Sequence, residues 1–99
     1  MSEPMSFQLD TGVVAQAIGG EMVLLDTRSG RYYDLNASGT LMLEALLRSQ
    51  SLAQAGAAVQ ARFAVSEAQV TADLHALIEL LSARGLLRAQ PRAPSVQQG

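Results

Sequence analysis

The order of its secondary-structure signals constrains this chain most: short β-rich runs fill the first third, and helical patterns fill the rest. Three runs separated by short turns are predicted to be strands, namely Val13–Ile18, Met22–Leu25 and Arg31–Leu35. The pair Gly19-Gly20 supplies the positive φ angles that a two-residue hairpin turn requires. Because short connections favour antiparallel neighbours, we expect a meander with the second strand in the middle.

Three helices are predicted to follow the strands. Asn36 or Ser38 is a suitable N-cap for the first helix, which carries leucines at helical spacing. The run Arg48-Ser49-Gln50-Ser51 interrupts it. The second helix is expected over about Leu52 to Phe63, and it includes Gly56 at a cost of about 1 kcal/mol relative to alanine.

The third helix has signals at both ends. Ser66 is expected to cap its first turn, and Gln69, three positions later, completes a capping-box pattern. The helix is expected to run to Arg84 and to stop at Gly85, which suits a left-handed C′ position. The sequence therefore predicts an α+β fold, a three-stranded antiparallel sheet followed by three helices, with the outline of a winged helix-turn-helix domain.

One domain is expected, because 99 residues are typical of a single hydrophobic core. Residues 1–11 are expected to form a partly flexible N-terminal segment and residues 12–88 the folded domain. The run Leu86-Leu87-Arg88 is expected either to pack back on the domain or to add a short extended segment. Residues 89–99 are rich in proline and glutamine and are expected to form a disordered tail.

Charge and composition disfavour several classes of function. The net charge is −2, with seven arginines, no lysine and nine acids, so the chain lacks the clustered positive charge of a polyanion-binding protein. The absence of cysteine excludes disulfides and cysteine–zinc sites. We find neither a signal peptide nor a run of about 18 apolar residues. We therefore expect a cytoplasmic protein that binds neither nucleic acid nor membrane.

The winged-helix outline leaves one alternative open, a DNA-binding transcription regulator. The third helix carries Glu67, Asp73 and Glu79 against a single base, Arg84. In a major groove these carboxylates would face the phosphates, and the chain has no lysine to offset them. DNA binding is therefore disfavoured but kept as the alternative.

Residues typical of a catalytic or metal site are also missing. His75 is the only histidine, and Asp73, its nearest acid in sequence, lies two positions away. Side chains at i and i+2 of a helix do not face each other. Without cysteine or lysine, neither a nucleophile–base pair nor a zinc site can be completed. We expect no catalytic activity, no metal and no cofactor.

The third predicted strand is the most informative candidate for binding. In a meander it lies at the sheet edge, so a row of its backbone N–H and C=O groups lacks partners. Alternation directs Tyr33 and Leu35 to one face, and Tyr32 and Asp34 to the other. Either the charged residues only protect the edge and the tyrosines only pack, or an extended peptide joins this edge as a fourth strand.

The third helix has a wider apolar arc than a core stripe needs. Its stripe includes Leu74, Leu77 and Leu81, and Leu80 lies to one side of that stripe, beside Ala76. Leu80 therefore either packs on the strand or the tail, or lines a groove between strand and helix. The sequence leaves these two possibilities open.

Several segments, which together span about residues 12–88, carry a family resemblance: Gly20–Asp26, Ser29–Asn36, Gly39, Phe63–Val65, the capped helix from Ser66, and Leu81–Leu87. Together they resemble the PqqD-like proteins, also called RiPP recognition elements. The pattern LLD…GRYYDLN…G is fairly specific as a set, although no single part of it is. The second helix is richer in alanine and glycine than is usual in the family, and Ala64 stands where glycine is common.

Within the family, the strand segments are most similar to the stand-alone members that serve lasso-peptide biosynthesis. The resemblance implies a winged-helix-like domain that binds the leader peptide of a ribosomally made precursor along Arg31–Leu35, without catalysis. The implied partners are a transglutaminase-like leader peptidase and an ATP-dependent, asparagine-synthetase-like cyclase. The alternative within the family is a peptide chaperone of coenzyme PQQ synthesis, whose partner would be a radical-SAM enzyme.

On this interpretation the leader lies between the third strand and the third helix. Val70, Leu77 and Leu80 are expected to form the apolar floor, with Asp73 and Arg84 as polar edges. The full set of residues expected to bind peptide is Arg31, Tyr32, Tyr33, Asp34, Leu35, Val70, Asp73, Ala76, Leu77, Leu80 and Arg84.

Overall fold

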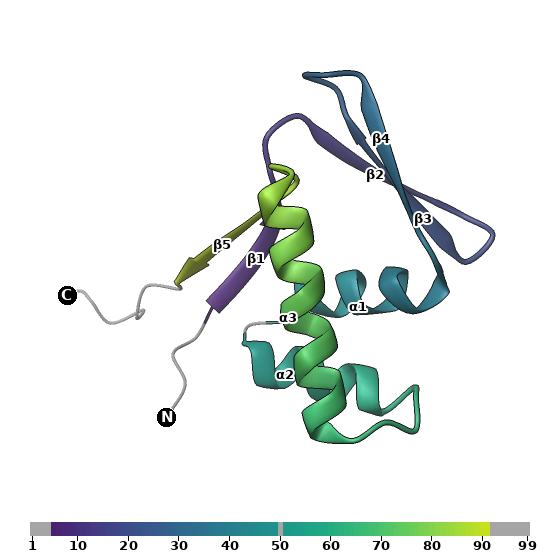
Figure 1. Cartoon of the computed structure of the whole chain (residues 1–99), viewed down its shortest axis with the longest axis vertical. Helices are drawn as coiled ribbons and strands as arrows, with labels where there is room; N and C mark the ends of the chain where they lie inside the picture. Colours follow the sequence, from purple (N-terminus) through teal and green to yellow (C-terminus); the bar gives the residue numbers. More distant parts are fainter. Residues whose placement is uncertain (1–4, 50, 92–99) are drawn as a thin grey trace.

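The computed structural model describes residues 5–49 and 51–91, which form two small sheets and three helices (Figure 1). In chain order the elements are β1 (Met5–Leu9), β2 (Val13–Ile18), β3 (Glu21–Asp26), β4 (Arg31–Leu35), α1 (Ala37–Arg48), α2 (Leu52–Gln60), α3 (Glu67–Ala83) and β5 (Leu87–Pro91). The predicted α+β class, with a three-stranded antiparallel sheet and three helices, is confirmed. The likeness to a winged helix-turn-helix domain stays a prediction.

Strands β2, β3 and β4 form the predicted meander, with β3 in the centre. Ile18 pairs with Glu21, so Gly19 and Gly20 alone make the turn between β2 and β3. Their φ angles are +59° and +84°, the positive values that a type I′ turn requires. The chemistry of this turn therefore sets the register of the sheet.

The N-terminal helix caps follow the sequence signals. Asn36 caps α1 by accepting a hydrogen bond from the Gly39 N–H (2.8 Å). Ser66 caps α3 by accepting one from the Gln69 N–H (3.0 Å). The side-chain amide of Gln69 donates to Asp73 Oδ1 (2.9 Å), one turn further along the helix.

Helix α3 ends as predicted, at a left-handed glycine. Gly85 has a φ angle of +73°. The Gly85 N–H donates to Ser82 O (3.0 Å) and the Leu86 N–H donates to Leu81 O (2.9 Å), the two bonds of a Schellman motif. Leu81 and Leu86 are both buried, which adds the apolar contact that usually accompanies this motif.

Helix α2 is shorter than predicted, because it ends at Gln60 and not near Phe63. The N–H groups of Arg62 and Phe63 both donate to Val59 O, at 3.0 and 2.9 Å. Sharing one carbonyl tightens the last turn and ends the regular helix.

A second sheet, not predicted from the sequence, pairs β1 with β5 in antiparallel fashion. Leu9 lies opposite Leu87 in the register, and Phe7 and Leu87 are both buried. Each strand finds its partner only at the other end of the chain, and alternation then directs the apolar side chains to the core.

Strands β1 and β5 extend into the two terminal segments that the sequence predicts to be flexible or disordered. Strand β1 lies within residues 1–11, where a partly flexible segment is expected, and β5 extends beyond residue 88, into the expected tail. Residues 1–4 and 92–99 of those two segments lie outside the described residues. The domain limits of 12 and 88 therefore stay a prediction.

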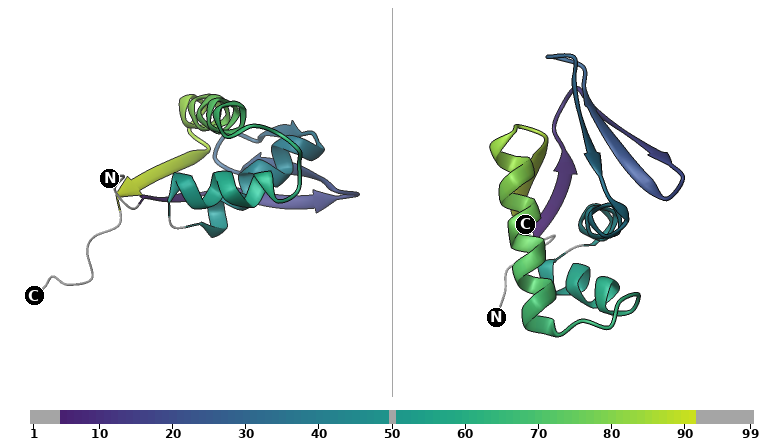
Figure 2. Two further views of the ribbon diagram at one scale, coloured as in Figure 1. Left: turned by 90° about the horizontal axis from the view of Figure 1, so that it is seen from below. Right: turned by 45° about the vertical axis from the view of Figure 1, so that its right-hand side comes forward.

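The hydrophobic core lies where the helices meet the inner face of the three-stranded sheet. Figure 2 shows α1 end-on between α3 and that sheet. The largest fully buried side chains come from β3, α1, α3 and the turn after α3: Leu24, Leu43, Leu46, Val70, Leu74, Leu81 and Leu86. The core is therefore aliphatic, as the 4% aromatic content of the sequence requires.

Candidate functional site

Strand β4 is an edge strand. In the described part of the chain its only strand neighbour is β3. In this antiparallel pair Arg31 lies opposite Asp26 at one end, and Leu35 lies opposite Met22 at the other. Its outer edge therefore presents backbone N–H and C=O groups that can pair with a further extended chain. The predicted open edge is present.

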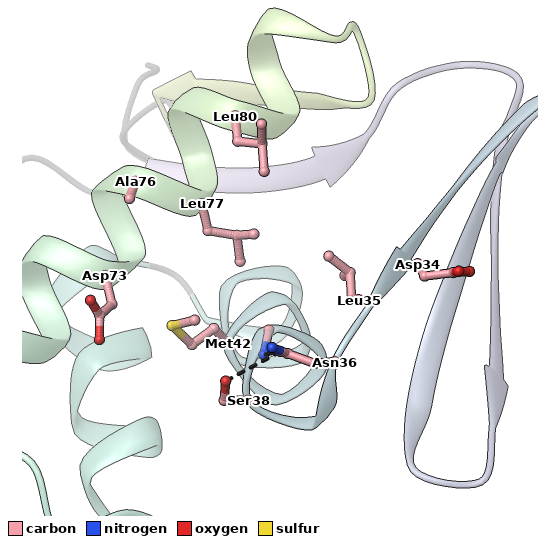
Figure 3. Close-up of a pocket in the computed structure, with 10 residues that line it drawn as sticks. Asp34, Leu35, Asn36, Ser38, Met42, Asp73, Ala76, Leu77 and Leu80 are labelled. Carbon is pink, nitrogen blue, oxygen red and sulfur yellow. Dashed lines mark hydrogen bonds between the residues drawn. The ribbon is translucent and has the colours of Figure 1, made fainter.

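A groove lies between the end of β4 and the middle of α3 (Figure 3). It has a volume of about 460 Å³. Leu35 and Leu77 are largely buried, whereas Leu80 keeps 46% of its surface exposed. Figure 3 shows these three leucines on opposite sides of the opening, with Leu35 directed toward α3. Leu80 thus lies at the groove and is not sealed in the core.

Six of the eleven predicted site residues line this groove. They are Asp34, Leu35, Asp73, Ala76, Leu77 and Leu80. The carboxylate of Asp34 points away from α3, so its contribution to the lining is on the strand side (Figure 3). The helical flank predicted around Leu80 and the strand therefore do meet at one site.

Val70 does not line the groove. It is 2% exposed, and its Cγ1 lies 3.7 Å from a Cβ built on Gly56 of α2. Val70 shares a helix face with Leu77, but seven residues separate them, or about 10 Å along the axis. The expected floor is corrected accordingly: Val70 belongs to the packing of α3 on α2.

The remaining predicted residues lie along β4 and at the far end of α3. Tyr33 is half-buried on the side of the strand that faces α3, and the Arg84 guanidinium lies over its ring, 5.2 Å from the centroid. Tyr32 points to the opposite face of the sheet and is 67% exposed. Arg31 is exposed at the start of the strand.

Part of the groove wall comes from the start of α1 and was not predicted. The additional lining residues are Asn36, Ser38, Gly39 and Met42. The Ser38 hydroxyl donates to Asn36 Oδ1 (3.3 Å), next to the cap of the helix (Figure 3). The Asn36 cap is the sequence signal that could have located these residues. Because it starts α1 directly after β4, the first turn of α1 must lie beside the same groove.

Arg28, in the turn between β3 and β4, forms hydrogen bonds both to the three-stranded sheet and to the end of α3. Its Nε donates to Asp26 Oδ1 (2.8 Å) and its Nη2 to Asp26 Oδ2 (3.2 Å), a bidentate pair. Nη2 also donates to Gly85 O (2.9 Å), and Nη1 lies 3.4 Å from Asp10 Oδ2. One guanidinium therefore connects the three-stranded sheet, the end of α3 and the turn between β1 and β2.

The Arg28–Asp26 pair also explains the titration behaviour of this region. The side-chain hydrogen bonds from Arg28 hold the pKa of the Asp26 carboxyl below its ordinary value of 3.8. The same bonds raise the pKa of the Arg28 guanidinium. Asp26 is buried, and it is stabilised there because both of its oxygens are paired.

The described residues contain no group of three or more His, Asp or Glu side chains that could hold a metal ion. His75 is exposed on α3, and it is not among the residues that line the groove. A search of the described helices for one long and apolar enough to cross a membrane finds none. What the described residues offer at the site is the open edge of β4 beside a groove lined largely by apolar side chains.

Comparisons with known proteins agree with this geometry. The family model described as coenzyme PQQ synthesis protein D (PqqD) matches residues 21–87, more than half of the chain. One similar solved structure is a lasso peptide synthetase B1 complexed with the leader peptide, with 29% identity and a TM-score of 0.77, over 84% of this chain and 98% of that one. Another is TbiB1 in complex with the TbiA(beta) leader peptide, with 27% identity and a TM-score of 0.76, over 82% and 94%. No curated protein sequence matches the chain.

Proposed function

Because this chain belongs to the PqqD family, we propose that it binds the leader peptide of a ribosomally made precursor and has no catalytic activity of its own. The observation that carries the proposal is the open edge of β4 beside the groove lined by Leu35, Leu77 and Leu80. The precursor is a lasso-peptide precursor, and the solved structures similar to this chain, both complexes with a leader peptide, support that choice.

The leader joins β4 as a fourth strand. Backbone hydrogen bonds to Arg31–Leu35 hold it in register, and alternate side chains enter the groove. The two open sides of the groove carry one acid each, Asp34 on β4 and Asp73 on α3, while the apolar surface comes from the leucines and Met42. Affinity therefore depends mainly on apolar side chains of the leader, and moderate salt should weaken it little.

The bound leader presents the precursor to the enzymes that process it, a transglutaminase-like leader peptidase and an ATP-dependent cyclase. The protein acts in the cytoplasm, where the precursor is made. Because the leader pairs only through one edge, the rest of the precursor and the outer side of the leader stay accessible to these enzymes.

The proposal is tested by titrating the protein with the leader of its precursor, alongside a scrambled leader of the same composition. Saturable binding with a Kd below about 100 μM, or about −5.5 kcal/mol, is expected for the leader only. A PQQ-type precursor peptide is titrated as a third arm. If the PQQ-type peptide binds and the lasso leader does not, the choice of precursor is wrong; if no peptide binds, the function is wrong.

A duplex DNA arm tests the remaining alternative. Salt-sensitive binding to duplex DNA, together with no binding of either leader, would favour a transcription regulator. The exposed acids Glu67 and Glu79 of α3 argue against that outcome.

A further inference from the structure

The outer face of the three-stranded sheet, which turns away from the core, carries a row of exposed apolar side chains. Val14 of β2 pairs with Leu25 of β3, and Leu25 pairs with Tyr32 of β4, so these three residues lie side by side across the sheet. Their exposed fractions are 52%, 39% and 67%. Ile18, on the same face by alternation, is 60% exposed. We call this row with Ile18 the outer patch.

The outer patch is not explained by the stability of the fold. The inward-facing neighbours Met22, Leu24 and Leu35 are buried in the core, whereas the patch faces water. Scattered single apolar residues are normal on a protein surface, but these align strand by strand. An aligned apolar row across three strands is typical of a surface that another protein covers.

The charged side chains that share the outer face of the three strands are acidic. The outward-facing positions of β2, β3 and β4 include two carboxylates, Glu21 and Asp34, and no arginine. Arg28, in the adjacent turn, is already bonded to Asp26 and to Gly85 O. A second copy of this chain packed face to face would bring like charges together without an opposite charge. A partner with lysine or arginine around an apolar centre is complementary to the patch.

The patch is continuous with the proposed leader site. Tyr32 belongs both to the patch and to β4, the strand that the leader joins. In a leader strand added at that edge, side chains alternate between the groove and the outer face. The outward side chains of the leader therefore extend the row from Val14 through Leu25 and Tyr32 onto the peptide.

We propose that the outer patch is the docking surface for the enzyme that processes the bound precursor, a protein whose own docking surface is apolar and bordered by lysine or arginine. This inference rests on the proposed function. The enzyme contacts the protein and the outward side chains of the leader on one surface, so it binds the complex more tightly than the protein alone.

The test uses a double variant, Val14→Thr with Leu25→Thr. Threonine is β-branched and suits a strand, and at both positions it replaces apolar surface with a hydroxyl group. Neither residue lies on β4 or lines the groove, so leader affinity should stay within about twofold of the wild type. Phe63→Thr is the matched control, because Phe63 is similarly exposed (37%) but follows α2, outside the sheet.

Binding of the purified leader peptidase and of the purified cyclase is measured to the wild-type, double-variant and control proteins, each saturated with leader. We expect the double variant, and not the control, to bind at least one enzyme about tenfold or more weakly. Glu21→Lys should also weaken the binding of that enzyme, and the loss of affinity should be smaller at high salt.

Three results would overturn parts of this account, and they are distinguishable. Leader binding with unchanged affinity of both enzymes for the double variant would reject the outer patch alone. A wild-type protein that dimerises by sedimentation, while the double variant stays monomeric, would assign the patch to a second copy. A wild-type protein that does not bind leader would reject the proposed function, and this inference with it.

Discussion

The gap between α3 and β4 is closed at one end and open in the middle. At the closed end, Gly85 O accepts a hydrogen bond from Arg28 (2.9 Å), and Arg84 lies over the ring of Tyr33. In the middle, Leu77 and Leu80 face Leu35 across a groove of about 460 Å³. The contacts at the closed end are polar and specific in direction, whereas the surface in the middle is apolar and partly exposed.

The closed end and the middle of the gap therefore have different roles: one fixes the position of α3, and the other offers apolar surface to a ligand. Directional hydrogen bonds and an ion pair fix how the end of α3 sits against the sheet, because they are satisfied in only one geometry. Among the described residues, none covers the exposed apolar surface in the middle, so its burial is available to a ligand. We therefore expect changes in the middle to alter leader binding and changes at the closed end to alter stability.

The largest effect is expected for Leu80→Glu. A carboxylate in the groove must lose its water when a leader binds, so affinity should fall by about 100-fold or more, equivalent to about 2.7 kcal/mol. The fold should persist, because Leu80 is already 46% exposed. Leader titration and thermal unfolding of the same samples measure both quantities.

His75→Glu is the matched control for Leu80→Glu. It adds the same negative charge to an exposed position of α3, about 140° around the helix from Leu80. If both variants weaken leader binding equally, charge and not the groove is responsible. If Leu80→Glu unfolds the protein, Leu80 is a core residue and the comparison between the two regions fails.

A smaller effect, on stability, is expected for Gly85→Ala at the closed end. Alanine at a φ angle of +73° should cost about 1–2 kcal/mol in the free energy of unfolding, measured by urea titration. Leader affinity of the folded protein should hardly change. Gly19→Ala is the control, since Gly19 has a φ angle of +59° in the turn between β2 and β3. A loss of affinity specific to Gly85→Ala would mean that the closed end also shapes the groove.

The smallest effect concerns pH and the ion pair at the closed end. Since folding lowers the pKa of Asp26 below 3.8, the pair contributes stability that is complete above that value. The contribution is lost as pH falls through the pKa of the folded state. The difference in unfolding free energy between wild type and Asp26→Asn should therefore shrink below about pH 4. A difference that is constant from about pH 7 to about pH 3 would contradict this role of the pair.

Much of the fold was predictable because its signals are local. The Gly19-Gly20 turn, the Ser66 cap and the Gly85 stop each depend on residues close together in sequence, and each is found in the structure. The pairing of β1 with β5 depends on segments at opposite ends of the chain, and neither segment alone carries a strong strand pattern.

The site was predictable to a similar degree and for the same reason. Helical periodicity identified Leu77 and Leu80 as neighbours, and alternation directed Leu35 to their side. Periodicity gives the angle around a helix but not the point along its axis at which a partner ends, so it also selected Val70. The contribution of Met42 required the angle at which α1 leaves β4, which no local pattern contains.

The pairing of β1 with β5 has a practical consequence for engineering. Met5 lies opposite Pro91, so the described chain enters and leaves the domain at neighbouring points. Figure 1 draws this strand pair on one side of α3 and the three-stranded sheet on the other. A short linker between the two strands would allow a circularly permuted protein with new termini at Gly19-Gly20, and a fluorescent label attached near either strand would leave the β4 edge uncovered.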